Sequence, residues 1–177
     1  MKYLFKTFLF LFTCSFLTFS DEFIEYAGYG VPGYGRKIVL ISGDQEYRSE
    51  ETMTQLGKIL AQHHGFHCKV LFAQDPSRPG FVDPEPANHI PGLDALKSAD
   101  LLILATRFLN LPDEQMQEID DYLLSGRPVL GLRTSNHGFK IPTTSKWAHY
   151  DWQYQGDKKE WQGGFGQIVF GGKFIDH

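Results

Sequence analysis

Cysteine and basic side chains are scarce in this 177-residue sequence, and each shortage excludes a class of protein. The only cysteines are Cys14 and Cys68, and Cys68 would stand alone after loss of an N-terminal leader, which excludes an internal disulfide framework. The formal net charge is -4, and nucleic acids and anionic membranes both require a basic face, so neither is an expected partner. With 42% hydrophobic and 21% charged residues, the composition is typical of one soluble globular domain.

Residues 1–20 have the pattern of an export signal. Lys2 and Lys6 flank the start of a phenylalanine-rich apolar stretch, and Thr18-Phe19-Ser20 supplies small residues where a signal peptidase cleaves. We therefore expect a periplasmic or extracellular protein with no stable membrane insertion after cleavage. An uncleaved anchor and, through Leu11-Phe12-Thr13-Cys14, a lipoprotein are less favoured alternatives.

Residues 21–36 are predicted to form a glycine-rich linker. Within them, Gly28-Tyr29-Gly30-Val31-Pro32-Gly33 matches the letters of the dinucleotide fingerprint G-x-G-x-x-G. That fingerprint needs a strand before it and a helix after it, so that the pyrophosphate meets the helix N-terminus. These glycines precede the first expected strand, and a dinucleotide site is therefore not predicted.

From residue 37 to the end of the chain, strands and helices are expected to alternate in one domain. Continuous apolar runs predict buried strands at residues 37–43, 67–73, 100–106 and 128–133. Between them, helices are predicted from an N-cap at Ser49 to Gly65, at residues 93–99, and from Pro112 to the residue before Gly126. This alternation, with right-handed crossovers, predicts an α/β fold with a parallel sheet covered on both faces.

Polar segments follow three of these strands. In open parallel sheets, ligands bind outside the carboxyl ends of the strands, where the strand order reverses. Arginines in such a crevice suit a polar, hydroxyl-rich or anionic small molecule. The three segments are Asp44-Gln45-Glu46-Tyr47-Arg48, Arg107-Phe108-Leu109-Asn110 and Arg133-Thr134-Ser135-Asn136-His137.

At these loops the sequence resembles the trehalose-utilisation (ThuA-like) family. The resemblance lies in the runs Ile41 to Arg48, Thr106 to Pro112 and Gly131 to Phe139, and it extends over residues 37–177. It implies membership of the class I glutamine amidotransferase-like superfamily and a flavodoxin-like three-layer sandwich. It also implies a role in carbohydrate utilisation, with sugars or oxidised keto-sugars as the substrate class.

The same resemblance argues against glutaminase activity. Glutaminases of this superfamily present a cysteine in a G-x-C-x-G turn, whereas here Gly131-Leu132-Arg133-Thr134-Ser135 places Arg133 at the nucleophile position. A guanidinium cannot form the thioester intermediate. Ser135 is the one nearby hydroxyl nucleophile, and it lacks the flanking glycines of an ester hydrolase.

Acid–base chemistry by Glu46 and His137 is the expected mechanism, with the reaction class (lyase, hydrolase or isomerase) left open. Alternatively, Glu46 is a solvated loop charge, His137 bonds a backbone carbonyl, and the arginines pair with acidic residues in a structural network. The protein would then be a noncatalytic carbohydrate- or partner-binding domain. The expected substrate-binding residues are Asp44, Tyr47, Arg48, Arg107, Asn110, Arg133, Thr134 and Asn136.

No cofactor is predicted, and a divalent metal is left open. His63, His64 and His67 cluster in sequence, but a helix end and the next strand direct them differently, so they are expected at the surface. His137 with Asp44 or Glu46 would be a better-placed ligand set, although it has no diagnostic spacing.

Residues 140–177 are expected to be irregular and rich in aromatic side chains. These aromatics either stack against a sugar ring or form a satellite core beside the sheet. The glycine-rich run from Gly163 to His177 is similar to a segment of the ThuA-like family, whose members continue further. The resemblance therefore implies either a fragment or a shortened member with an open edge.

Overall fold

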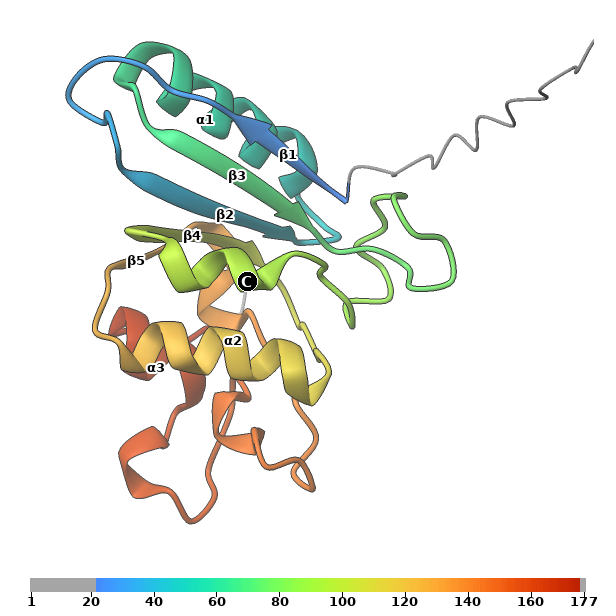
Figure 1. The fold of residues 1–177 in the computed structure, drawn as a ribbon. Coiled ribbons are helices and arrows are strands. Elements are labelled where there is room, and N and C mark those ends of the chain that lie inside the picture. Colours follow the sequence, from blue (N-terminus) through green and yellow to red (C-terminus); the bar gives the residue numbers. More distant parts are fainter. Residues whose placement is uncertain (1–21, 176–177) are drawn as a thin grey trace, which may run out of the picture.

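The computed structural model describes residues 22–175, so the predicted signal peptide and His177 lie outside the described residues. Five strands form one sheet in the order β1-β3-β2-β4-β5 (Figure 1). β2, β3, β4 and β5 are parallel, whereas β1 pairs antiparallel with β3. The predicted α/β class with a mostly parallel sheet is therefore confirmed. The strands are β1 (Phe23–Tyr26), β2 (Lys37–Gly43), β3 (His67–Phe72), β4 (Leu101–Thr106) and β5 (Val129–Gly131).

Helices connect consecutive parallel strands. α1 (Ser49–His64) joins β2 to β3, the 3-10 helix η1 (Leu93–Ser98) joins β3 to β4, and α2 (Asp113–Leu124) joins β4 to β5. The chain moves outward from β2 to β3 and then returns to the other side of β2 for β4 and β5. The strand order therefore reverses between β2 and β4. After β5 come η2 (Arg133–His137), η3 (Ala148–Tyr150), η4 (Lys159–Trp161) and α3 (Gly164–Phe170).

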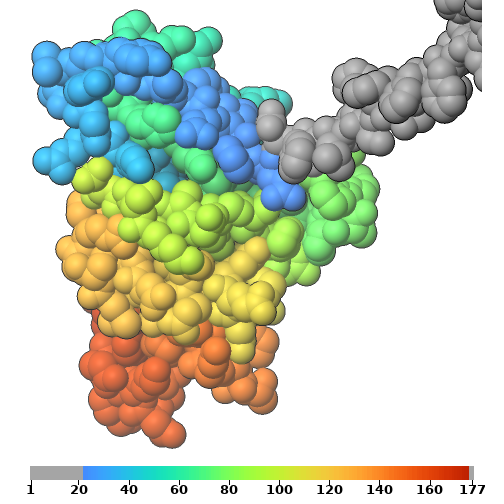
Figure 2. Space-filling model, in the orientation of Figure 1, coloured from blue at the N-terminus to red at the C-terminus, as the bar shows by residue number. Residues whose placement is uncertain are grey.

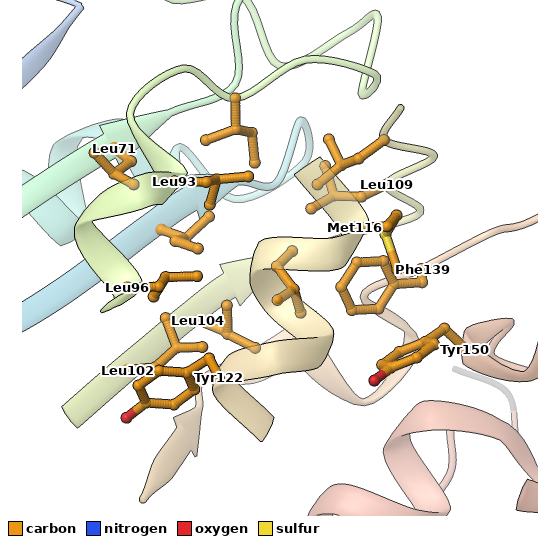
Figure 3. Packing of buried hydrophobic residues seen from close by; sticks show 14 of the residues in the cluster. Leu71, Leu93, Leu96, Leu102, Leu104, Leu109, Met116, Tyr122, Phe139 and Tyr150 are labelled. Atoms are coloured by element: carbon orange, nitrogen blue, oxygen red, sulfur yellow. The ribbon is translucent and has the colours of Figure 1, made fainter. Parts of the chain in front are cut away.

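The sheet is buried on both faces because its central strands are apolar at nearly every position. Along β2, Ile38 and Leu40 pack in the core that contains α1, whereas Val39 and Ile41 pack in the core that contains η1 and α2. Figure 3 shows this second core, in which Phe139 and Tyr150 extend the apolar packing away from the sheet. Alternation of side chains across a strand thus supplies two cores from one continuous apolar run.

The prediction of a flexible linker at residues 21–36 was wrong for residues 23–26, which form the edge strand β1. β1 extends the sheet by pairing with Cys68 to Leu71 of β3. The four-residue strand precedes a run of glycines, and those glycines obscured it in the sequence. One of them, Gly28, lies so close to Phe66 that an added Cβ would be 2.1 Å from the carbonyl oxygen, so this approach requires glycine.

Two further boundaries differ from prediction. β5 ends at Gly131, not at residue 133, because Arg133 turns the backbone into η2 with a φ of 48°. Ser49 is the first residue of α1 and does not cap it, because its hydroxyl accepts the backbone N–H of Asp44 at 3.0 Å.

The C-terminal aromatic residues do not form the separate satellite core that was one expectation: most of them pack in the core around α2, together with the short helix α3, which the sequence did not indicate. Trp147, Tyr150 and Phe165 are buried and continue the core around α2. The Tyr150 hydroxyl donates to Asp120 at 2.7 Å, and burial together with this carboxylate raises the Tyr150 pKa far above its usual range. In Figure 2 these late residues, in orange and red, form the end of the molecule opposite β1. Within residues 22–175, none of the helices combines the length and apolarity needed to cross a bilayer.

Candidate functional site

A pocket of about 250 Å³ lies at the carboxyl ends of the parallel strands; we call it the sheet-edge pocket. Its walls come from the loop after β2, from η2 after β5, and from one residue close to the C-terminus. Glu46 and His137, the expected acid–base pair, both line it. The complete lining is Glu46, Tyr47, Arg133, Thr134, Asn136, His137 and Phe174.

Asp44 lies beneath this pocket in a buried junction and does not line it. Its carboxylate accepts the backbone N–H groups of Glu46 at 2.8 Å and Tyr47 at 3.3 Å, and it also accepts the Thr134 hydroxyl. Asp44 is only 2% exposed. It therefore fixes the loop after β2 to η2, and its oxygens are occupied by protein donors.

Ser135 belongs to the same buried junction. Its hydroxyl lies 2.8 Å from the carbonyl oxygens of Leu104 and Leu132, to which it can donate, and it accepts the Thr106 N–H at 3.4 Å. Ser135 is 1% exposed, so its oxygen has no access to a ligand in the pocket. This geometry agrees with the absence of an esterase motif around Ser135.

Glu46 forms the acidic wall of the sheet-edge pocket. Its Oε2 lies 3.0 Å from Nε of Arg107, and the two form an ion pair without the alignment of a hydrogen bond. The Arg107 backbone N–H donates to Gly43 at 2.9 Å, which ties the end of β4 to the end of β2. Arg107 therefore acts on the pocket through Glu46 and is not itself part of the lining.

Arg133 forms the basic wall and has strained backbone geometry. Its φ of 48° lies in the left-handed region, which costs free energy for a residue with a Cβ. The guanidinium carbon lies 3.9 Å from the centre of the Tyr47 ring, in cation–π contact. The turn after β5 thus presents Arg133 to the pocket.

His137 is buried among aromatic rings at the base of the pocket. Phe108 lies 5.2 Å and Phe174 4.3 Å from its imidazole, centre to centre. His137 Nδ1 lies 2.8 Å from Oδ1 of Asn136, so this nitrogen donates to the amide oxygen and the contact fixes the orientation of the ring. Trp152 packs against both Phe108 and Phe174, which completes an aromatic wall.

Backbone contacts hold this wall in place. Phe108, with a φ of 53°, donates its N–H to the carbonyl of His137 at 3.1 Å, and Leu109 donates to Gly138 at 2.8 Å. On the other side, Gly166 of α3 lies against Asn136, where an added Cβ would be 2.0 Å from the carbonyl oxygen. η2 is thus held between the loop after β4 and α3.

Four of the expected binding residues do not line the sheet-edge pocket: Asp44 and Arg107, described above, and also Arg48 and Asn110. Arg48 is exposed and pairs with Glu51 on the surface of α1. Asn110 is exposed and its backbone bonds to Ala87 at 2.7 Å. Conversely, sequence reasoning missed Phe174 as a lining residue. The glycine pair Gly171-Gly172 before it and its aromatic character were the available signals, but nothing local placed Phe174 beside His137.

Within residues 22–175, no three His, Cys, Asp or Glu side chains gather as a possible metal site. His67 pairs with Glu25 of the neighbouring edge strand. Cys68 is buried, and desolvation raises the pKa of its thiol to about 11, so it is not a nucleophile of the kind a glutaminase needs.

Comparisons of the chain with protein-family models, with curated proteins and with solved structures gave no match.

Proposed function

We propose that the protein is an exported, ThuA-like member of the glutamine amidotransferase-like superfamily that acts on a sugar or keto-sugar. The observation that carries this proposal is the shared pocket of Glu46 and His137, which lie 91 positions apart in the sequence and line one hollow. The strand order β3-β2-β4-β5 supports the flavodoxin-like part of the proposal, because that fold has the same order and binds ligands at its reversal point.

The chemistry of the lining suits a hydroxyl-rich ligand. Glu46, Asn136 and Arg133 offer acceptors and donors to hydroxyl or carbonyl oxygens, while the Phe174 ring offers an apolar face for a pyranose. A pocket of about 250 Å³ admits a compact sugar unit, with any second unit directed outward.

In the proposed reaction Glu46 and His137 exchange protons with the substrate. Glu46, held beside Arg107, takes a proton from a sugar carbon or hydroxyl, and His137 in its protonated form gives one to a glycosidic or carbonyl oxygen. Arg133 stabilises negative charge that develops on that oxygen. The protein releases no ammonia from glutamine, because Arg133 stands where the thiol would be required.

Binding and turnover of keto-disaccharides and their parent sugars test this function. We expect turnover by the native sequence and a loss of about 100-fold or more in Glu46→Gln and His137→Ala, the usual size for general acid–base groups. Asn110→Ala is the matched control, since Asn110 lies outside the pocket, and it should retain activity.

Saturable sugar binding that survives both substitutions, with no turnover by any version, would contradict catalysis and favour a noncatalytic carbohydrate-binding domain. The ion pair between Glu46 and Arg107 is the observation that favours this second function, because it also explains Glu46 as a structural charge. Absence of both binding and turnover for every sugar would overturn the carbohydrate assignment.

A further inference from the structure

His137 is largely covered although it lines the sheet-edge pocket. It is only 5% exposed. Three aromatic rings surround its imidazole: Phe174 at 4.3 Å, Phe108 at 5.2 Å and Trp152 at 6.3 Å, centre to centre. A general acid or base must come within hydrogen-bond distance of the atom with which it exchanges a proton. A substrate can therefore reach His137 only after part of this cover has moved.

Backbone hydrogen bonds hold His137 and two of the three rings in place. The His137 carbonyl accepts the backbone N–H of Phe108 at 3.1 Å. Trp152 donates its backbone N–H to the carbonyl of Phe139 at 3.1 Å, and Phe139 is fully buried. A shift of either ring together with its backbone would break a bond next to the core, so neither is suited to move.

Phe174 lies on an exposed segment, residues 171–175, which we call the Phe174 strap. The strap leaves the end of α3 through Gly171 and Gly172, and an added Cβ at either glycine would meet no atom within 4 Å. The Gly172 N–H donates to Gly166 at 3.2 Å, which fixes the start of the strap to α3. Within the strap, Phe174 is the one residue that is not exposed. Two glycines with space around them thus precede the ring that lies nearest to His137.

Phe174 also has space to move into. It forms a wall of the sheet-edge pocket and of a second hollow of about 360 Å³, which Trp152 and Gln155 also line. A side chain in a close-packed core cannot be displaced without disturbing its neighbours, whereas a ring between two hollows has room on either side. Phe174 can therefore leave His137 without disturbing the core.

We propose that Phe174 is a gate over His137 and that the Phe174 strap swings about Gly171 and Gly172 to open it. When the gate is closed, the ring covers the imidazole. When it is open, the sheet-edge pocket and the second hollow join into one larger site. Glycine gives the backbone the freedom that such a hinge needs. The catalytic consequence, that opening precedes proton transfer by His137, rests on the proposed function, whereas the gate itself does not.

Chemical modification of histidines measures the gate without any sugar. Diethyl pyrocarbonate acylates neutral imidazoles, and mass spectrometry of peptides gives the rate for each histidine. In the native sequence, His137 should react at about a tenth of the rate of the exposed His63, or more slowly. His149 is 6% exposed and packs against Trp161, so a rise in its rate reports unfolding and not movement of the strap.

Substitutions in the Phe174 strap separate the ring from the hinge. Phe174→Ala should raise the rate of His137 by about tenfold while His149 stays unchanged. Phe174→Leu should give an intermediate rate, and it keeps the test valid if Phe174→Ala also exposes His149. Ile175→Ala is the matched control, because it removes an exposed apolar side chain from the next position and should leave the rate of His137 unchanged.

Gly172→Ala tests the hinge directly. The φ of Gly172 lies outside the left-handed region and the site has room for a Cβ, so alanine fits the closed gate. Alanine restricts the open strap more than the closed one, and the rate of His137 should therefore fall by about threefold.

Three results would overturn the proposal. Equal rates for His137 and His63 in the native sequence would show that the imidazole is not covered. A rate of His137 that is the same with Phe174, leucine or alanine at position 174 would show that Phe174 is not the cover. An unchanged rate in Gly172→Ala would show that the strap does not swing there. Because the measurement contains no sugar, these results are independent of whether the protein turns over a sugar.

Discussion

Two acidic residues that leave the same strand, Asp44 and Glu46, have opposite environments. Asp44 is buried and its oxygens are occupied by backbone and hydroxyl donors from two loops. Glu46 is exposed, lines a pocket and has one charged partner, Arg107. The comparison shows that position at a strand end does not by itself identify a ligand-binding residue. The side chains available to a ligand are those that the protein's own donors have not already occupied.

The largest effect that this comparison predicts is on stability. Asp44→Ala leaves the Thr134 hydroxyl and two loop N–H groups without their acceptor and should lower the free energy of unfolding by about 3 kcal/mol. Glu46→Ala removes a partly exposed ion pair and should cost less than about 1 kcal/mol. Urea unfolding of both variants measures the difference. If both variants lost the same free energy of unfolding, Asp44 in the buried junction and Glu46 in the pocket would not differ in their structural role.

Thr134 belongs to both regions, so its substitution sharpens the comparison. Thr134→Val keeps the shape of the side chain but removes the donor to Asp44, and we expect a loss of about 1.5 kcal/mol in unfolding free energy. In the same urea series, Asn136→Ala keeps the buried junction intact, so its free energy of unfolding should be closer to that of the native sequence. A stability of Thr134→Val equal to that of the native sequence would mean that this hydroxyl contributes nothing to the junction.

The smallest expected effect concerns Glu46→Gln. It is nearly isosteric and removes only the charge beside Arg107, so the unfolding free energy should change by about 0.5 kcal/mol or less. Any loss of sugar turnover in this variant therefore reports on chemistry and not on folding. If the midpoint temperature of thermal unfolding of Glu46→Gln instead fell by many degrees, the role of Glu46 would be structural.

The sequence predicted the fold best where burial decides the structure. β2, β3 and β4 are largely apolar runs, and a strand buried on both faces must be apolar at nearly every position. β1 was missed because four residues at a sheet edge carry almost no periodic signal. α3 was missed because its glycines have low helix propensity, and packing against η2 overrides that preference.

The sequence predicted only part of the candidate site, because it indicates the strand ends but not the directions of the side chains that follow them. Topology alone places Glu46 and His137 at one sheet edge, since both follow parallel strands. Topology does not say which side chains turn inward, so Arg48 and Asn110 were included although they lie outside the pocket. Phe174 reaches the pocket through tertiary packing from a distant segment, and no local pattern in the sequence encodes that position.

The most direct measurement is the NMR titration of a keto-disaccharide into labelled protein, with the ring signals of His137 followed as sugar is added. We predict that the ring signals of His137 shift saturably as sugar is added, while the backbone amide signal of Asp44 changes little. In Glu46→Gln the sugar should bind more weakly, so that the shift needs a higher sugar concentration. In Asn110→Ala the shift should be the same as in the native sequence. A His137 signal that stays fixed while sugar binds elsewhere, or while none binds at all, would contradict the account.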